Sequence, residues 1–278
     1  MGQKKLIKFA AIKEYENVLE YPQGMPGKWN SFFENLATGP YPISLDDLAV
    51  VKSDTPAQTP MKALTLELAC GRGEYAVGLA RMFPDQNFLG LDVKGNRIWK
   101  GASIANKEVI KNVAFVRTQI EQAIQYFSKE EVNEIWITFP DPQLRLSKAK
   151  KRLTHPQFLR LYQQFLKQAD TSNKTGIVHL KTDSPNLFLF TLKVIELYGL
   201  NLVYKSDDLY AEAKIDPRCL IKTYYEGKDI AQSNKIHYIQ FTLDKDLPLS
   251  LDEVLKEAIK DIPLDAGELL RMQSYEQE

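Results

Sequence analysis

The sequence contains a glycine turn enclosed by two acidic residues, a spacing that suits the binding of a nucleoside. Glu67 lies in the apolar run TLELA, and a turn with Gly71 and Gly73 follows it directly. Asp92 ends the next apolar run, NFLGLD. In a βαβ unit, a carboxylate about twenty residues after the turn binds the hydroxyl pair of a ribose. We therefore expect this region to bind an adenosine-containing cofactor.

Glu67 favours S-adenosylmethionine over a dinucleotide as that cofactor. As a bare motif, Gly71 to Ala76 reads GxGxxA, which NAD-dependent dehydrogenases also satisfy. A carboxylate on the strand before the turn repels a pyrophosphate, whereas it attracts the ammonium group of a methionine. A charge inside an apolar strand is also costly to bury without a partner. We therefore interpret Glu67 as a contact of the methionine end of the cofactor.

A second segment combines a rigid aspartate with a strongly basic run. Asp141 stands between Pro140 and Pro142, and the two prolines hold its carboxylate at a set angle. The run from Arg145 to Arg152, RLSKAKKR, has five positive and no negative side chains. Such a run also occurs as a solvated cationic loop, but its place beside Asp141 favours contact with nucleic-acid phosphates.

Composition limits the other classes of function. The chain has 278 residues, enough for a full α/β core with extensions, and a formal net charge of zero, so a nucleic-acid surface must be a local patch. Cys70 and Cys219 form no CxxC pair and the histidines lack ligand spacing, so we expect neither a disulfide scaffold nor a metal site. We see no membrane-spanning run and no secretory leader, and expect a cytoplasmic enzyme.

Short apolar runs and helical patterns alternate along the middle of the chain. We expect strands at residues 64–69, 87–92, 113–117, 133–139 and 176–181, and helices at 73–83, 94–108, 119–128, 154–169 and 185–199. This order predicts an α/β, Rossmann-like fold whose mostly parallel sheet has helices on both faces. The later stretches NLVYK and KIHYIQFTL predict an antiparallel pair at the sheet edge. The expected parts are an N-terminal arm and linker at 1–60, a core domain at 61–245 and an acidic helical tail at 246–278.

The fold prediction brings the candidate residues together. Ligands of such sheets bind outside the carboxyl ends of the strands. That edge would carry the turn after Ala69, Asp92, the Thr118–Gln119 junction, the Phe139–Pro142 segment and the Lys181–Asp183 segment. Segments more than a hundred residues apart in sequence are thus expected to share one site.

The motifs occur in the order seen in one enzyme family. LELACGRGEY, FPDP, KAKKRLTHPQFL, HLKTD and the Thr223 to Glu226 segment resemble those of bacterial tRNA (guanine-N7-)-methyltransferases, over about residues 60 to 243. The resemblance implies a class I methyltransferase fold. It also implies methyl transfer from S-adenosylmethionine to N7 of a guanosine in the tRNA variable loop, usually at position 46.

The resemblance also implies residue roles. The cofactor-binding positions are Glu67, Gly71, Gly73, Asp92, Gln119 and Asp141, and Asp141 is in addition the catalytic position. The substrate-binding positions are Arg145, Lys148, Lys150, Lys151, Arg152, Asp183, Thr223 and Glu226. The chain departs from the family at Ala69-Cys70 in place of Gly-Phe, at Gln119 in place of Asp or Asn, at Gln143 in place of Trp and at Arg145 in place of Lys.

The chemistry agrees with the residue types. Guanine N7 carries a lone pair and needs no deprotonation, so a nucleophilic side chain is unnecessary and alignment of the reacting atoms is the main requirement. Two other functions stay open from the sequence: an NAD-dependent Rossmann oxidoreductase, and a non-catalytic RNA-binding subunit with a methyltransferase fold. Monomer and homodimer are both compatible with the sequence.

Overall fold

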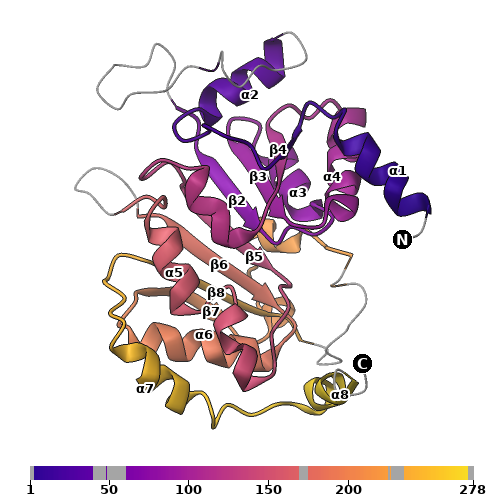
Figure 1. The fold of residues 1–278 in the computed structure, drawn as a ribbon. Coiled ribbons are helices and arrows are strands. Elements are labelled where there is room, and N and C mark those ends of the chain that lie inside the picture. Colours follow the sequence, from indigo (N-terminus) through magenta and orange to yellow (C-terminus); the bar gives the residue numbers. More distant parts are fainter. Residues whose placement is uncertain are drawn as a thin grey trace. The chain divides into compact units, whose positions relative to one another are not determined.

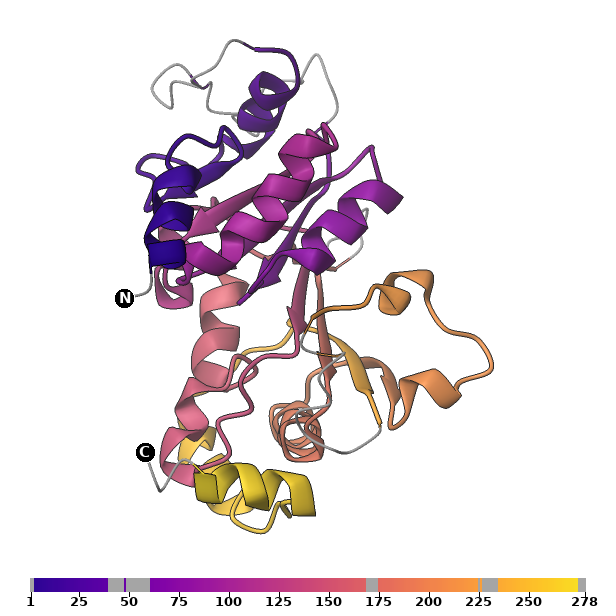
Figure 2. The ribbon, with the colours of Figure 1, turned by 90° about the vertical axis from the view of Figure 1, so that its right-hand side faces the viewer.

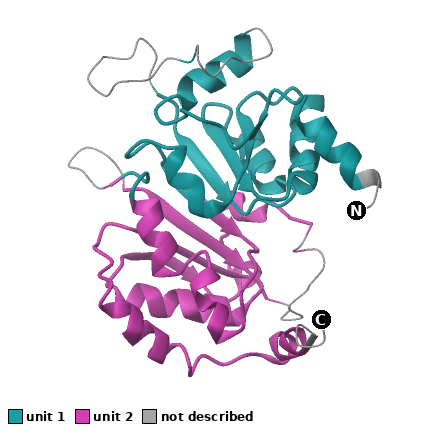
Figure 3. Ribbon diagram, viewed as in Figure 1, with its two compact units in different colours: residues 1–135, 164–167 teal, residues 136–163, 168–278 magenta. Residues whose placement is uncertain are grey.

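The chain divides into two compact units, which are coloured separately in Figure 3. The computed structural model describes residues 3–39, 48, 61–168, 175–224, 226 and 235–274. Unit 1 comprises residues 1–135 and 164–167, and unit 2 comprises residues 136–163 and 168–278. The elements of both units are labelled in Figure 1.

Unit 1 is built on four parallel strands in the order β1-β4-β3-β2. Their bounds are Val18–Glu20 (β1), Leu64–Leu68 (β2), Asn87–Asp92 (β3) and Val113–Arg117 (β4). Every residue of β2 and β3 is buried, which explains why these strands are continuous apolar runs rather than alternating ones. The register places Glu67 opposite Gly90 and Asp92 opposite Arg117. Both acidic residues of the glycine-turn motif therefore belong to this sheet.

The helices of unit 1 are α1 (Gln3–Ile12), α2 (Trp29–Thr38), α3 (Glu74–Met82), α4 (Gly95–Lys107) and the 3-10 helix η1 (Ile120–Gln125). Helices α3 and α4 pack against each other and against the strands (Figures 1 and 2). Gly101 permits the close approach of α4, because a Cβ there would lie 2.6 Å from the carbonyl oxygen of Arg72 in the glycine turn.

The N-terminal residues contribute directly to unit 1. Helix α1 packs along α4, and β1 extends the sheet with Val18 opposite Phe115. In α2, Trp29 is 1% exposed, and its Nε1 donates to the carbonyl of Tyr126 at 2.8 Å. Within the arm and linker expected at 1–60, residues 40–47 and 49–60 lie outside the described residues.

Among its described residues, unit 2 contains the strands β6, β8 and β7 in this order, paired antiparallel. Their bounds are Ile177–Thr182 (β6), Leu202–Ser206 (β7) and His237–Thr242 (β8), and β5 (Glu134–Thr138) contains the boundary between the units. The helices are α5 (Pro156–Gln163), α6 (Pro185–Leu197), α7 (Leu251–Ala258) and α8 (Ala266–Ser274), with 3-10 helices η2 (Leu146–Lys151), η3 (Leu209–Ala211) and η4 (Pro217–Leu220). The mixed α/β class, the parallel strands and the antiparallel edge pair expected from the sequence are confirmed.

Two expected helices are shorter than their patterns predicted. The segment 119–128 forms only the 3-10 helix η1. The segment 154–169 forms α5 only as far as Gln163, because Leu166 then makes a parallel bridge with Val132 and Lys167 donates its N–H to the Val132 carbonyl at 2.8 Å. A bridge to Val132, just before β5, therefore overrides the helical period at the end of this segment.

Candidate cofactor and acceptor sites

The Asp92 carboxylate is fixed by the backbone of unit 1. Its Oδ2 accepts from Gly71 N at 2.9 Å, and its Oδ1 accepts from Lys94 N at 2.7 Å. The residue is 7% exposed at the carboxyl end of β3. A carboxylate has about four lone-pair positions, so both oxygens can accept further hydrogen bonds from a ribose. The glycine turn and Asp92 are thus one structural element, as their spacing predicted.

The turn itself is a run of left-handed residues. Ala69, Gly71 and Gly73 have φ values of 53°, 55° and 68°. Gly73 is required by packing, because a Cβ there would lie 2.3 Å from Cε1 of Phe115. Ala69 adopts the left-handed conformation despite its Cβ, which costs about 1–2 kcal/mol.

The N–H groups of this turn are bonded within the protein. Cys70 N donates to the carbonyl of Leu91 at 3.0 Å, Gly73 N donates to that of Cys70 at 2.8 Å, and Gly71 N is held by Asp92. Glycine turns of this kind often aim N–H groups at a ligand, whereas the structure uses these three to shape the turn. A dinucleotide site needs N–H groups aimed at its pyrophosphate. The arrangement therefore disfavours the oxidoreductase alternative.

Glu67 has a partner that sequence reasoning missed. Its side chain lies in β2, is 3% exposed, and accepts from Ala76 N at 2.8 Å through Oε2. Because Ala76 lies in the first turn of α3, the carboxylate caps this helix and interacts favourably with its dipole. Glu67 therefore joins the strand before the turn to the helix after it.

Gln119 lies at the same strand edge as Asp92. The preceding Thr118 donates its N–H to the Asp92 carbonyl at 3.0 Å, and its hydroxyl lies 2.9 Å from that of Tyr126. Gln119 itself is exposed where η1 begins. Asp92, the glycine turn and Gln119 therefore lie together in unit 1, with Gln119 exposed and the Asp92 carboxylate buried.

In unit 2, the Asp141 loop follows the end of β5 and is strained on both sides of the aspartate. Phe139 and Gln143 have φ values of 47° and 48°, although neither is glycine. Phe139 N donates to the Lys181 carbonyl at 2.8 Å, and Gln143 N donates to Asp141 Oδ1 at 3.1 Å. The Asp141 side chain is 55% exposed, with Arg271 Nη2 at 3.7 Å from Oδ1. Strained backbone around an exposed carboxylate is a common feature of functional sites.

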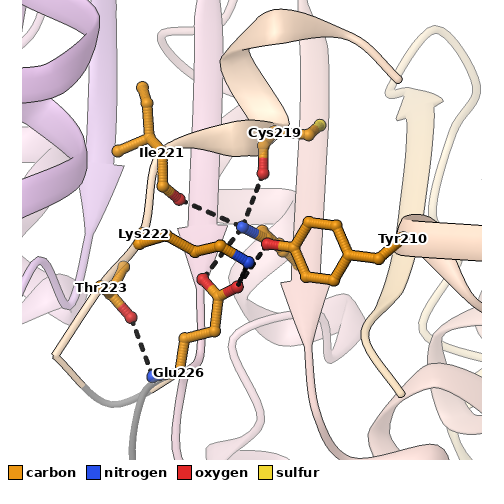
Figure 4. A network of polar contacts seen from close by, with 7 residues as sticks. Tyr210, Cys219, Ile221, Lys222, Thr223 and Glu226 are labelled. Atoms are coloured by element: carbon orange, nitrogen blue, oxygen red, sulfur yellow. Dashed lines mark hydrogen bonds and ion pairs between the residues drawn. The ribbon is translucent and has the colours of Figure 1, made fainter. Parts of the chain in front are cut away.

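Glu226 is the centre of a buried polar network in unit 2 (Figure 4). Its Oε2 lies 3.2 Å from Lys181 Nζ, and its Oε1 accepts from Lys222 Nζ at 2.7 Å and from the Tyr210 hydroxyl. Burial opposes ionisation, but Lys181, Lys222 and Tyr210 hold the pKa of Glu226 below its ordinary value. Glu226 N donates to Thr223 Oγ1 at 3.2 Å. The two predicted substrate residues Thr223 and Glu226 are therefore part of one folded segment.

Lys181 is a cation in the interior of unit 2. Its side chain has no solvent-exposed area, and its Nζ donates to the carbonyls of Cys219 and Ile221 at 2.7 and 3.2 Å in addition to Glu226. Burial lowers the pKa of Lys181, an effect that Glu226 opposes. Asp183, two residues further on, is half-buried just after β6 ends. Lys181 thus binds Cys219, Ile221 and Glu226 near the end of β6, the strand that Asp183 follows.

The basic run separates into exposed and buried members. Lys148, Lys150 and Lys151 are exposed on and beside η2, and Arg145 is half-buried. Arg152 is only 1% exposed, unlike the three lysines, so its contact with RNA stays a prediction that its burial does not favour. A 3-10 helix has three residues per turn, which places Arg152 on the same inward face as the buried Ala149.

Some contacts of the site carry no sequence signal. The position of Lys181 near the carboxyl end of a strand predicts a role in the site. No sequence motif points to Tyr210 or to the tail residues Glu268 and Arg271. Among the described residues, no cluster of three or more His, Cys, Asp or Glu side chains could hold a metal ion. Within the same residues, no helix is long and apolar enough to cross a membrane.

Comparison with known proteins identifies the family. A family model described as a putative methyltransferase matches residues 61–239. A tRNA (guanine-N(7)-)-methyltransferase of Bacteroides fragilis is 42% identical over 254 residues, covering 88% of each chain. A Bacteroides thetaiotaomicron protein of the same name is 41% identical over 274 residues, covering 95% of this chain and 93% of that protein. A solved 16S rRNA methyltransferase is 14% identical, with a TM-score of 0.47 over 65% of this chain and 87% of its own. The chain therefore belongs to the family of tRNA (guanine-N(7)-)-methyltransferases.

Proposed function

We propose that this protein transfers a methyl group from S-adenosylmethionine to N7 of a guanosine in tRNA, at position 46 as the family resemblance implies. The observation that carries the proposal is the Asp141 carboxylate, which is exposed in a loop whose backbone is left-handed on both sides of it. Strain at such a loop is retained where a carboxylate must be held at a set angle. The Bacteroides relatives, which are named for this activity, support the choice of reaction.

The cofactor is assigned to unit 1. Asp92 offers carboxylate acceptors for the ribose hydroxyls, and Gln119 lies at the same edge for the adenine side. Glu67 adds negative charge beneath the turn, which suits the cationic cofactor and would repel a pyrophosphate. When bound, S-adenosylmethionine supplies a methyl group carried by a positively charged sulfur. A contact between Asp141 and this cofactor remains a prediction from the resemblance.

The guanine is assigned to unit 2. The N7 lone pair forms a bond to the methyl carbon as the carbon–sulfur bond breaks, and that electron pair stays on sulfur. Asp141 would accept hydrogen bonds from the N1–H and N2–H₂ edge of guanine, and its charge would offset the positive charge that develops on the ring. Adenine lacks this pair of donors, so the same contact selects guanine. Asp183, Thr223 and Glu226 are the other residues proposed to hold the substrate.

No nucleophilic side chain is needed for this reaction. Cys70 lies in the cofactor turn, where burial and the nearby Glu67 raise the pKa of its thiol well above the ordinary value. A protonated, buried thiol is a poor nucleophile. Cys70 therefore fits packing of the turn and not covalent catalysis.

The test is nucleoside mass spectrometry of unmethylated tRNA after incubation with the protein and isotope-labelled cofactor. We expect label in 7-methylguanosine with the parent and loss of most transfer with Asp141→Asn. Asp246→Asn, which alters an exposed aspartate of the same unit, is the control and should transfer at the parental rate. Binding of S-adenosylhomocysteine without binding of NADH would exclude the oxidoreductase. If the parent binds S-adenosylhomocysteine and tRNA but labels no guanosine, the proposed activity is wrong.

A further inference from the structure

Arg152 is held by a fixed set of partners in the interior of unit 2. Its Nε and Nη2 both donate to the Gln143 carbonyl, at 3.3 and 3.2 Å, and Nη2 also donates to Asn186 Oδ1 at 2.8 Å. The guanidinium lies 4.4 Å from the centre of the Phe190 ring. Burial lowers the pKa of Arg152 to about 10, against the opposing effect of Glu268, so the group is charged at neutral pH. A buried, charged guanidinium with such partners is a structural element.

The carbonyl that Arg152 binds belongs to the Asp141 loop. Gln143 has a φ of 48°, and its N–H donates to Asp141 Oδ1. Two charge-assisted hydrogen bonds on one carbonyl stabilise a backbone conformation that a non-glycine residue otherwise avoids. The orientation of the Asp141 carboxylate therefore depends on the peptide units that Arg152 fixes.

Asn186 connects Arg152 to the C-terminal tail. Its Nδ2 donates to the carbonyls of Ile262 and Pro263 at 3.4 and 3.0 Å, and its backbone N–H donates to Glu268 Oε1 at 3.2 Å. Glu268 also accepts from the hydroxyl of Ser184, the N-cap residue of α6. A carboxylate at this helix end interacts favourably with the helix dipole.

The tail contributes a buried residue and a second contact to this region. Glu268 in α8 is 1% exposed, although it belongs to the acidic tail, whose charged residues are ordinarily solvated. One turn further along α8, Arg271 lies 3.7 Å from Asp141. The tail lies beyond residue 239, where the match to the family model ends. Residues outside the family match therefore support the loop that carries Asp141.

We propose that Arg152 is a positioning residue for methyl transfer, which holds the Asp141 loop through the Gln143 carbonyl and is itself held by Asn186 and the tail residue Glu268. The proposal rests on the proposed function of Asp141. The alternative is that Arg152 binds an RNA phosphate, as its place in the basic run suggested. A phosphate contact would require Arg152 to leave three hydrogen bonds and the Phe190 ring, whereas Lys148, Lys150 and Lys151 are already exposed beside it.

The experiment compares three variants with the parent. Arg152→Lys retains the positive charge. Its single ammonium group cannot bind the Gln143 carbonyl and Asn186 Oδ1 with the geometry of the planar guanidinium. Glu268→Gln retains the shape of the tail residue and removes its charge. Arg160→Lys is the matched control. Like Arg152, Arg160 donates to a backbone carbonyl, that of Leu247 at 2.7 Å, and it also pairs with Asp252. Neither of these partners belongs to the Asp141 loop. Each protein is measured for kcat and KM with tRNA, for binding of S-adenosylhomocysteine, for thermal midpoint and for amide hydrogen exchange of a peptide covering residues 139–146.

We expect Arg152→Lys to lower kcat by about tenfold or more, since small misplacements of a reacting group have effects of this size. The KM for tRNA and the cofactor affinity should stay within about twofold, and exchange in the 139–146 peptide should increase. Glu268→Gln should change kcat and exchange in the same direction, and Arg160→Lys should change neither, even if its thermal midpoint falls. This pattern separates positioning from a general loss of stability.

Two results would overturn the inference. An unchanged kcat and exchange rate in Arg152→Lys would show that the loop does not depend on the guanidinium. A raised KM for tRNA, at parental kcat and parental exchange, would assign Arg152 to RNA binding. A parent protein that transfers no methyl group would disprove the proposed function. Hydrogen exchange does not depend on the reaction, so the exchange data would still decide whether Arg152 and Glu268 hold the loop.

Discussion

Lys181 Nζ lies 3.2 Å from Glu226 Oε2, and the two side chains are 0% and 6% exposed. Lys181 belongs to β6, whereas Glu226 lies more than forty residues later, in the segment that follows η4. Tyr210 and Lys222 donate to the other oxygen of Glu226 (Figure 4). The ion pair therefore anchors a segment that carries two predicted substrate residues to the strand that precedes a third, Asp183.

We predict that Glu226→Ala lowers the free energy of unfolding by about 3 kcal/mol at neutral pH, because it leaves Lys181 charged and buried without its carboxylate. Lys222→Ala is the control: its side chain is 62% exposed, so losing this contact should cost less than about 1 kcal/mol. Urea unfolding measures both. The pKa of Glu226 is lowered in the folded protein, so the contribution of the pair is present above the unfolded-state pKa and is lost as pH falls through the folded-state value. Equal effects of the two substitutions would contradict the structural importance of the pair.

His155 should make the protein less stable in mild acid. Burial lowers its pKa to about 4, although Asp252 opposes this shift, and Lys150, Arg160 and Arg152 reinforce it. Its Nδ1 accepts from Gln157 N at 3.1 Å at the start of α5, a bond that only an unprotonated Nδ1 can accept. The unfolded chain therefore binds the proton first, and stability falls as pH drops from about 6.5 towards 4, by up to about 3 kcal/mol.

The measurement is the free energy of unfolding across this pH range for the parent and His155→Asn. Asparagine keeps an acceptor for the start of the helix but does not titrate. The variant should lose less stability between pH 6.5 and pH 4 than the parent. His237 titrates in both proteins, so the difference between their curves isolates His155. Parallel curves would show that the protonation of His155 is not coupled to folding.

Asp92→Ala should weaken cofactor binding and loosen the glycine turn. It removes the acceptor proposed for the ribose, worth about 1.5–3 kcal/mol, together with the bonds from Gly71 N and Lys94 N. We expect the dissociation constant for S-adenosylhomocysteine to rise about tenfold or more and the thermal midpoint to fall. Asp85→Ala, at an exposed aspartate after α3, should change neither quantity. Calorimetric titration that gives parental affinity for Asp92→Ala would refute the ribose assignment.

Local patterns in the sequence predicted β2, β3, β4 and the glycine turn of unit 1 correctly, because these features depend on residues close together in the chain. The short strand β1 was not predicted. Asp92 could be placed from its spacing alone, since a βαβ unit fixes the distance between the turn and the next strand end. The capping role of Glu67 was not predictable, because it depends on how closely α3 approaches β2.

The burial of Arg152 could not be predicted from the sequence. A count of charges treats each member of a basic run alike, whereas the structure exposes Lys148, Lys150 and Lys151 on η2 and buries Arg152 just after it. Sequence also could not reveal that Glu268, more than a hundred residues later, lies beside the same helix end as Asn186. Long-range polar contacts of this kind leave no periodicity in the chain and are found only from coordinates.

The exposed lysines beside Asp141 are predicted to bind tRNA phosphates. Changing Lys148, Lys150 and Lys151 together to glutamine should weaken tRNA binding and leave the affinity for S-adenosylhomocysteine unchanged, because the lysines lie in unit 2 and the proposed cofactor residues of the turn lie in unit 1. Each phosphate contact that is lost should flatten the logarithmic dependence of affinity on salt by about 0.7–0.9. Arg152 is left unchanged in this variant because it is buried.

The control removes the same charge from another part of unit 2. Lys193 in α6, Lys256 in α7 and Lys260 just after α7 pair with Glu196, Glu253 and Glu257, and their triple glutamine variant has the same net charge. We expect this control to bind tRNA almost as tightly as the parent with the parental salt slope, since a change in net charge alone acts weakly and at long range. Affinities measured across a salt series distinguish the two variants. If both weaken binding equally, the lysines of η2 act only through overall charge, and RNA recognition must be sought on a different surface of the protein.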